Sequence, residues 1–174
     1  QVKLSKRKRS IVEKLELLII DEVSMVRADL LDVIDAVLRK YSVRAAGRVM
    51  PFGGAQVLMI GDPYQLPPVV TRDERPGLLA RYASPFFFEA EAFQRLAPEV
   101  IELRKVYRQQ DAAFIALLNA LRDGQATPAT LDPLRPRVQP GILDQVPPGY
   151  LTLCTHRAAA TAINERELGR LKGA

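Results

Sequence analysis

The hydrophobic pattern of this chain is organised around four consecutive aliphatic residues, Leu17–Ile20, which run directly into two carboxylates, Asp21 and Glu22. An apolar run of this length bounded by polar residues is typical of a parallel strand buried on both faces. We therefore predict a strand over Glu16–Ile20. Because ligands of open α/β sheets bind at the carboxyl ends of the strands, Asp21 and Glu22 stand where a site would form.

A second apolar run repeats this arrangement. Gln56–Ile60 predicts another buried strand, which is followed by Gly61, Asp62 and Gln65. Glycine permits a close approach of the backbone, and the prolines that follow stiffen the exit from the strand. An amide both donates and accepts hydrogen bonds, so Gln65 could sense a γ-phosphate or the water that attacks it.

Two interpretations of Asp21 and Glu22 follow from the residues alone. They are either solvated acids at the end of a core strand, because hydrophobic-hydrophobic-Asp-Glu is a short and common pattern, or they form a Walker B element. In the second case Asp21 holds Mg²⁺, usually through water, and Glu22 activates the water that attacks a γ-phosphate. The similar strand end at Gly61–Gln65 favours the second interpretation.

Apolar residues at helical spacing predict helices in the rest of the chain. The predicted helices are Ser5–Lys14, Ala28–Tyr41, Glu89–Leu96, Asp111–Arg122 and Arg157–Leu171, with a short one near Pro128–Leu134. We expect N-caps at Ser5 and Thr155 and a C-terminal stop at Gly124. Two more apolar stretches, Val100–Leu103 and Tyr150–Cys154, predict strands. Prolines are dense over residues 125–149, which excludes a long helix or a central strand and predicts a connector.

Within Ala28–Tyr41 the helical pattern separates an apolar face from a polar one. Much of the polar face is supplied by Asp29, Asp32, Asp35, Arg39 and Lys40, and acids early with bases late suit the helix dipole.

Three other features each allow two interpretations. Phe86–Phe88 could stack on bases, but three aromatics in a row more often anchor a loop to the core. Arg108, just before a helix, is either structural or an arginine finger that reaches a γ-phosphate, and the sequence leaves this open. A basic cluster near the start of the chain is either a solvated face or a phosphate contact, with the solvated face favoured. This cluster consists of Lys3, Lys6, Arg7, Lys8 and Arg9.

Composition limits the classes of protein and of partner to which the chain could belong. The 174 residues carry a net charge of +5 and a pI near 9.6, which is compatible with nucleic acid binding but is weak evidence for it. No apolar run is long enough to cross a membrane. A single cysteine, Cys154, excludes an internal disulfide and fits a reducing cytoplasm, and its apolar surroundings predict a buried thiol. The chain begins at Gln1 without a methionine, so we expect a fragment of a longer protein.

Several of these segments together resemble superfamily 1 helicases of the 5′-to-3′ branch, most closely the PIF-type DNA helicases and more distantly the RecD-like helicases. The two strand ends and the arginine motif carry the resemblance. They read Leu-Ile-Ile-Asp-Glu-Val-Ser-Met (18–25), Pro-Phe-Gly-Gly-Ala-Gln (51–56), Gly-Asp-Pro-Tyr-Gln-Leu-Pro-Pro-Val (61–69) and Val-Tyr-Arg-Gln (106–109). Asp-Glu alone is unspecific, whereas Pro-Phe-Gly-Gly and Gln-Leu-Pro-Pro-Val at this spacing are specific.

The resemblance implies an α/β fold: a partial RecA-like parallel sheet with flanking helices, followed by the beginning of a second RecA-like domain. Residues 1–104 would end the first motor domain and residues 105–174 would start the second. ATP and Mg²⁺ are the implied cofactors, and single-stranded or forked DNA is the implied partner of a protein that we expect to be monomeric.

Residue by residue, the resemblance implies that Asp21 and Glu22 bind Mg²⁺ and activate water. Gly61, Asp62 and Gln65 would belong to motif III, which couples the γ-phosphate to DNA, and Arg108 would be the motif IV arginine. Glycine lets a phosphodiester approach the backbone, so two loops are candidates for lining the DNA track. Their residues are Pro51, Phe52, Gly53, Gly54, Pro67 and Pro68.

The sequence also departs from this family. It contains no Gly-x-x-x-x-Gly-Lys-Ser/Thr, so the loop that cradles the phosphates is expected upstream. His156 stands where an asparagine is expected, and a solvated residue at a helix start is the more probable role for it. We therefore expect the 174 residues alone to lack ATPase activity. The alternatives are a non-catalytic helicase remnant that binds DNA or protein, and a RecD-like helicase.

Overall fold

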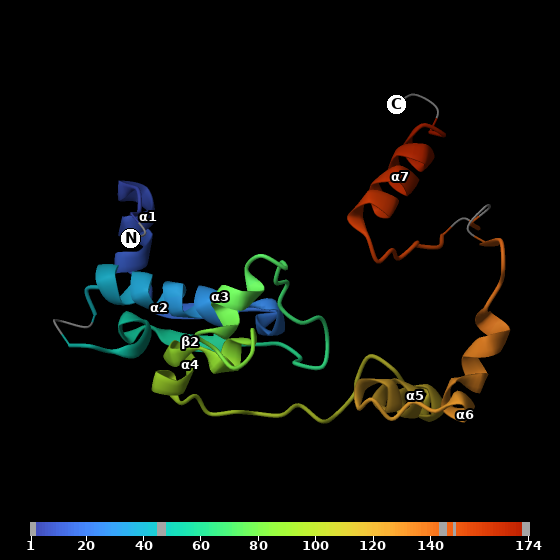
Figure 1. Ribbon diagram of the computed structural model, residues 1–174, viewed down its shortest axis with the longest axis horizontal. Helices are drawn as coiled ribbons and strands as arrows, with labels where there is room; N and C mark the ends of the chain where they lie inside the picture. The colour runs from blue at the N-terminus through green and yellow to red at the C-terminus, as the bar shows by residue number, and fades with distance from the viewer. Residues whose placement is uncertain (1–2, 45–47, 143–145, 148, 172–174) are drawn as a thin grey trace. The chain divides into compact units, whose positions relative to one another are not determined.

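The computed structural model describes residues 3–44, 48–142, 146–147 and 149–171 (Figure 1). Helices and strands are mixed along the chain, and two compact units are present, Gln1–Ala126 and Thr127–Ala174. The first unit contains α1 (Lys6–Glu13), β1 (Leu17–Ile20), η1 (Val23–Met25), α2 (Ala28–Tyr41), η2 (Pro51–Gly54), β2 (Gln56–Met59), α3 (Arg75–Leu79), η3 (Phe87–Glu89), α4 (Glu91–Leu96) and α5 (Ala112–Arg122). The second contains α6 (Pro128–Leu131), η4 (Asp132–Arg137) and α7 (Arg157–Leu168).

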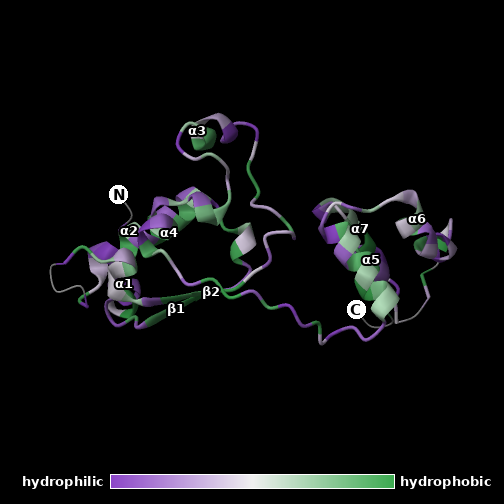
Figure 2. Cartoon of the chain, turned by 90° about the horizontal axis from the view of Figure 1, so that it is seen from below, coloured by the Kyte–Doolittle hydropathy of each residue, from purple (hydrophilic) through white to green (hydrophobic). Residues whose placement is uncertain are grey.

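The two predicted strands pair in parallel, and their register places Leu17 opposite Gln56 and Ile20 opposite Met59. Figure 2 shows β1 as a hydrophobic ribbon. The inward-facing side chains of this sheet, Leu18 and Val57 among them, pack on the core of the first unit. The outward face differs from the prediction of burial on both sides. Its apolar residues are 43–55% exposed because none of the described elements covers them; they are Leu17, Ile19, Leu58 and Ile60.

Helix α2 has the bounds that its apolar pattern predicted, and it supplies the centre of the core. Leu31 is fully buried and Leu38 nearly so, and Phe52 from η2 packs in the same cluster with no exposed surface. Burial of side chains of this size stabilises a fold by about 1.5–3 kcal/mol each. Phe87 joins this core and contacts Phe88 and Phe93 edge to face, which confirms that the phenylalanine run anchors a loop.

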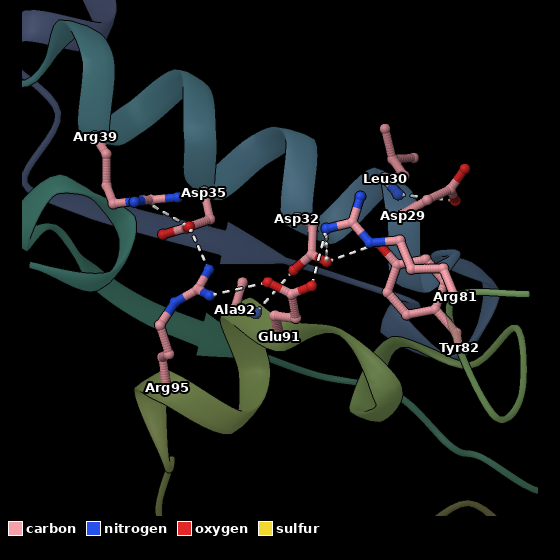
Figure 3. Close-up of polar contacts among 10 residues, drawn as sticks. All are labelled: Asp29, Leu30, Asp32, Asp35, Arg39, Arg81, Tyr82, Glu91, Ala92 and Arg95. Atoms are coloured by element: carbon pink, nitrogen blue, oxygen red, sulfur yellow. Dashed lines mark hydrogen bonds and ion pairs between the residues drawn. The ribbon is translucent and has the colours of Figure 1, made fainter. Parts of the chain in front are cut away.

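Part of the polar face of α2 packs against protein, which the amphipathic pattern does not reveal for Asp32 and Asp35. Asp35 is fully buried, and its Oδ1 accepts a hydrogen bond of 2.7 Å from the Phe52 N–H. Its Oδ2 binds Arg39 at 2.8 Å and Arg95 at 3.0 Å (Figure 3). Segment 81–95 therefore covers the side of α2 that a helical pattern assigns to water.

Asp32, one turn earlier on α2, binds the same segment. Its two oxygens accept hydrogen bonds of 2.7 Å from the Tyr82 hydroxyl and the Ala92 N–H (Figure 3). Burial raises the pKa of Tyr82 well above its usual range, and the hydrogen bond to the Asp32 carboxylate raises it further. Tyr82 therefore stays protonated and donates to Asp32 throughout the neutral range.

Most helix predictions are confirmed, with shifts at the ends. Ser5 caps α1 by accepting from the Lys8 N–H, and Asp111 caps α5 by accepting from the Phe114 N–H. Gly124 ends α5 with a positive φ of 66°. The expected N-cap of α7 is one residue off, because His156 and not Thr155 occupies that position. The Thr155 hydroxyl instead lies 2.9 Å from the Nδ1 atom of exposed His156.

The two later strand predictions are wrong. Val100–Leu103 and Tyr150–Cys154 form no strand, because a strand exists only where a neighbour accepts and donates its ladder hydrogen bonds, and β1 and β2 are the paired strands of the described chain. The prediction of a buried thiol is also wrong, since Cys154 is exposed. None of the helices described in residues 3–171 has the length and apolar character of a membrane span.

The buried carboxylate of Asp35 yields a stability prediction. We expect Asp35→Ala to lower the free energy of unfolding by about 3–5 kcal/mol, because removal of one member of a buried ionic cluster leaves its partners unpaired. Asp35→Asn retains an acceptor for the Phe52 N–H, so it should lower the free energy of unfolding by less than Asp35→Ala does. Glu13→Ala, which removes an exposed i,i+4 partner of Arg9, should change the free energy by less than about 1 kcal/mol. Urea unfolding of the three variants measures this, and an Asp35→Ala protein as stable as Glu13→Ala would contradict it.

Candidate functional site

Asp21 and Glu22 form a strained turn at the carboxyl end of β1. Glu22 has φ 51° and ψ 42°, a left-handed conformation that is uncommon for residues other than glycine and that occurs often at functional sites. The Glu22 N–H donates to the Asp21 Oδ1 at 2.9 Å, and η1 begins at the next residue. Both carboxylates are exposed, and both leave the sheet at the same strand end.

The end of β2 is held against this turn by backbone hydrogen bonds. The Ile60 N–H donates to the Ile20 carbonyl and the Val23 N–H donates to the Ile60 carbonyl, each at 2.9 Å. These bonds continue the parallel ladder past both strands and around the Asp21–Glu22 turn. The two strand ends that the sequence singled out are therefore neighbours in space.

Gly61 is required where the two strand ends meet. A Cβ atom built on Gly61 would lie 2.9 Å from the Val23 nitrogen and 3.2 Å from the Ser24 nitrogen, both backbone atoms. Side chains do not approach backbone this closely, so the packing of the turn against β2 depends on the missing side chain. Val23 and Ser24 are buried beneath this contact, a role that the sequence pattern did not predict.

Asp62 organises the loop that follows Gly61. Its Oδ1 accepts from the Tyr64 N–H at 3.1 Å, its Oδ2 accepts from the Gln65 Nε2 at 3.2 Å, and its carbonyl accepts from the Gln65 N–H at 3.0 Å. Such a turn fixes the direction in which Gln65 leaves the backbone. Gln65 itself is exposed beside the turn.

An arginine that the sequence analysis did not select completes this loop. The Arg122 guanidinium, in the last turn of α5, forms an ion pair with the Asp62 Oδ2 and lies 5.6 Å from the centre of the Tyr64 ring. Burial raises the pKa of Asp62, but the hydrogen bonds from Tyr64, Arg122 and Gln65 outweigh it and hold that pKa below its ordinary value. Asp62 is therefore ionised at neutral pH. A separation of 60 residues hides this pair from any local pattern.

Arg108 is not brought to the other predicted site residues. It is exposed on the segment between α4 and α5, where residues 97–111 form neither helix nor strand. Among the described residues of the first unit, no hydrogen bond or ion pair joins Arg108 to Asp21, Glu22 or Gln65.

The two loops predicted to line a DNA track are packed differently. In η2, Phe52 and Gly53 are buried: the Gly53 carbonyl accepts from the Ser42 hydroxyl at 2.7 Å, and a Cβ on Gly53 would lie 2.6 Å from the Leu38 carbonyl oxygen. Pro51 and Gly54 keep partial exposure. In the second loop Pro67 is exposed and Pro68 is buried.

The carboxyl end of β1 offers oxygen ligands of the kind that a divalent cation needs. Mg²⁺ is usually held by one or two carboxylates, with water and substrate phosphates completing its shell. Asp21 and Glu22 fit this need, since both are exposed and the Asp21 Oδ1 is directed by the Glu22 N–H. The described residues contain no group of three or more acidic, histidine or cysteine side chains arranged around a metal position.

Comparison with protein families matches residues 1–131 to the family described as PIF1-like helicase. The chain belongs to this family. Among curated relatives, the human ATP-dependent DNA helicase PIF1 is 38% identical over 159 residues, which cover 90% of this chain and 22% of that protein. The ATP-dependent DNA helicase RRM3 of Saccharomyces cerevisiae is 42% identical over 112 residues, 64% of this chain and 14% of that protein. The chain thus spans about a fifth of the length of the relatives it matches.

Solved structures of the family have the same fold. The Pif1 helicase from Bacteroides, in complex with ADP-AlF3 and ssDNA, superposes with a TM-score of 0.82 at 39% identity, covering 100% of this chain and 40% of that one. Pif1 from Candida albicans gives a TM-score of 0.75 at 31% identity, covering 97% of this chain and 35% of that one. The predicted α/β class with a partial RecA-like parallel sheet is therefore confirmed.

The contact at Gly61 predicts the effect of a single methyl group on this site. Gly61→Ala would push the Asp21–Glu22 turn away from β2. If these acids serve in ATP hydrolysis, a displacement of about 1 Å costs on the order of 100-fold in rate, and we then expect DNA-stimulated ATPase activity of the full-length protein to fall by roughly that factor.

Gly77→Ala is the matched control, because no atom lies within 4 Å of a Cβ at that position. It should leave the ATPase rate unchanged. A Gly61→Ala protein with the wild-type rate would show that the close packing of the two strand ends does not matter to the site.

Proposed function

We propose that this chain is part of an ATP-dependent DNA helicase that moves 5′ to 3′ along single-stranded DNA and couples Mg-ATP hydrolysis between two RecA-like domains to unwinding. One observation carries the proposal: the Asp21–Glu22 turn is packed against the Gly61–Gln65 strand end, so acids and an amide suited to γ-phosphate chemistry share one edge of a parallel sheet. The relatives support it, since they are named ATP-dependent DNA helicases.

In this proposal Asp21 holds Mg²⁺ and Glu22 orients and deprotonates the attacking water. Bound Mg²⁺ would neutralise charge that develops on the phosphates. The exposed carboxylate of Glu22, set by its left-handed backbone, has room to accept a proton from a water at the strand end. Gln65, directed by Asp62, would contact the same water or the γ-phosphate.

Residues 1–104 would then belong to the first motor domain and residues 105–174 to the second, with 125–149 as connector. Arg108 stands at the start of the second segment, exposed and without a partner among the site residues described above. We infer that it reaches the γ-phosphate as an arginine finger when nucleotide draws the two domains together. The loop that cradles the phosphates is absent from these 174 residues, so it would come from another part of the protein.

The solved relatives support DNA as the partner. The Bacteroides protein is described in complex with ssDNA, and another structure concerns unwinding at forked dsDNA by two coordinating Pif1 helicases. We propose single-stranded and forked DNA as ligands of the protein that carries this chain. Since Phe52, Gly53 and Pro68 are buried, direct contacts would fall to Pro51, Gly54 and Pro67.

Glu22→Gln in the full-length protein tests the function. An amide retains the shape of the side chain but accepts no proton, and loss of a general base typically costs about 100- to 10,000-fold in rate. We expect DNA-stimulated ATPase activity to collapse while nucleotide binding survives. Retained activity would overturn the assignment of Glu22, and a wild-type protein without any DNA-stimulated ATPase would favour a non-catalytic module that binds DNA or protein.

The isolated 174 residues should not hydrolyse ATP. They supply the water-activating acids but no lysine-containing phosphate loop, and positioning of the phosphates is a large part of phosphoryl-transfer catalysis. Turnover of Mg-ATP by the purified 174-residue chain, measured with the Glu22→Gln chain as background, would contradict this.

A further inference from the structure

The loop that carries Gln65 is connected to α5 through one ionised carboxylate. The Asp62 Oδ2 accepts from the Gln65 Nε2 at 3.2 Å and also binds the guanidinium of Arg122. The same guanidinium lies against the Tyr64 ring, at 5.6 Å from its centre. Arg122 therefore contacts two of the first four residues after Gly61, and it does so from an element that begins 50 residues later in the chain.

Asp62 sets the orientation of the Gln65 amide. An ionised carboxylate only accepts hydrogen bonds, so the amide NH₂ must point toward Asp62 and the amide oxygen Oε1 must point away from it. With Nε2 occupied, Oε1 is the atom left to accept a hydrogen bond from a water or another donor. An amide oxygen in this position suits the orientation of an attacking water, whereas an NH₂ group would repel the hydrogen that such a water presents.

We propose that Arg122 is a positioning residue for ATP hydrolysis: by binding Asp62 and Tyr64 it holds the motif III loop so that the Gln65 amide oxygen is presented to the attacking water. This inference rests on the proposed function and deepens it. Arg122 does not touch the nucleotide in this scheme and acts through Asp62.

The exposure of the pair suits a contact that opens and closes. The Arg122 side chain is 47% exposed and that of Asp62 is 20% exposed, so solvent screens their attraction and the pair contributes little to folding. A contact of this kind can break and form again within a reaction cycle. It also ties the helix that follows Arg108 to the loop that carries Gln65, so a movement of α5 would reach the amide.

The test uses the full-length protein with saturating single-stranded DNA and compares four variants with the wild type: Arg122→Ala, Arg122→Lys, Gln65→Ala, and Arg122→Ala combined with Gln65→Ala. We expect Arg122→Ala to lower kcat by about threefold to tenfold, the lower part of the range of couplings between contacting side chains, with KM for ATP and the melting temperature unchanged. Arg122→Lys retains the charge and should recover part of the loss. In the Gln65→Ala background, removal of Arg122 should have no further effect.

Arg166→Ala is the matched control, because Arg166 is 45% exposed and pairs with an exposed glutamate, Glu167. It should leave kcat unchanged. A wild-type kcat for Arg122→Ala, or a loss that adds fully to that of Gln65→Ala, would overturn the inference. A loss of kcat that parallels a lower melting temperature would also overturn it and assign Arg122 a structural role.

Adding Glu22→Gln to this experiment separates the inference from the proposed function. If Glu22→Gln abolishes ATPase activity and Arg122→Ala leaves it intact, only the role of Arg122 fails. If the wild-type protein has no ATPase activity, or if Glu22→Gln retains it, the proposed function fails and the role of Arg122 fails with it.

Discussion

The parallel pairing of β1 and β2 is the constraint on which the rest of the site depends. Its hydrogen bonds do not stop at the strands: the Ile60 N–H reaches the Ile20 carbonyl, and the Ile60 carbonyl accepts from the Val23 N–H, beyond the Asp21–Glu22 turn. The left-handed backbone of Glu22 is unfavourable by itself, and surrounding contacts must stabilise it. The extended ladder and the close contact at Gly61 provide them. These contacts hold the two acids that follow β1 in a defined position.

Behind the sheet, α2 is held from both sides, and this gives the strands a rigid base. Its apolar side chains enter the core, and its buried carboxylates bind segment 81–95 and the Phe52 N–H. Buried charges stabilise a fold only when they are fully paired, and Asp35 meets that condition with three donors. Because one of these donors belongs to η2, the Pro-Phe-Gly-Gly segment is fixed by α2 as firmly as a regular element.

Apolar patterns in the sequence predicted the helices and strands whose burial is set by their own residues. Leu17–Ile20 and Gln56–Met59 follow from their apolar runs, and Ala28–Tyr41 follows from its helical spacing. Val100–Leu103 and Tyr150–Cys154 are apolar stretches as well, but they have no strand neighbour, and an apolar stretch carries no information about its neighbours. The burial of Asp35 was missed for a related reason, since a polar residue at a helical position is assigned to solvent unless its partners, Arg95 among them, are known.

The candidate site likewise contains residues that the sequence identifies and residues that only the structure identifies. Asp21, Glu22, Gly61 and Gln65 could be selected because motif and strand end coincide in the sequence, whereas the ion pair between Asp62 and Arg122 joins residues 60 positions apart. Tyr64 was likewise not selected, since a cation–π contact between distant residues produces no local sequence pattern. Arg108 could be selected by its motif, but its place relative to the acids depends on how separate segments of the chain come together.

The contacts that hold the two strand ends differ in strength, and this difference matches the roles proposed for the residues. The Asp21–Glu22 turn is held by backbone hydrogen bonds and by the buried residues Val23 and Ser24. The Gln65 loop is held by one carboxylate and a half-exposed arginine, contacts that solvent weakens. If Asp21 and Glu22 hold a metal ion and the attacking water while Gln65 senses the phosphate, as we propose, this difference has a use: the amide could move while the acids stay in place.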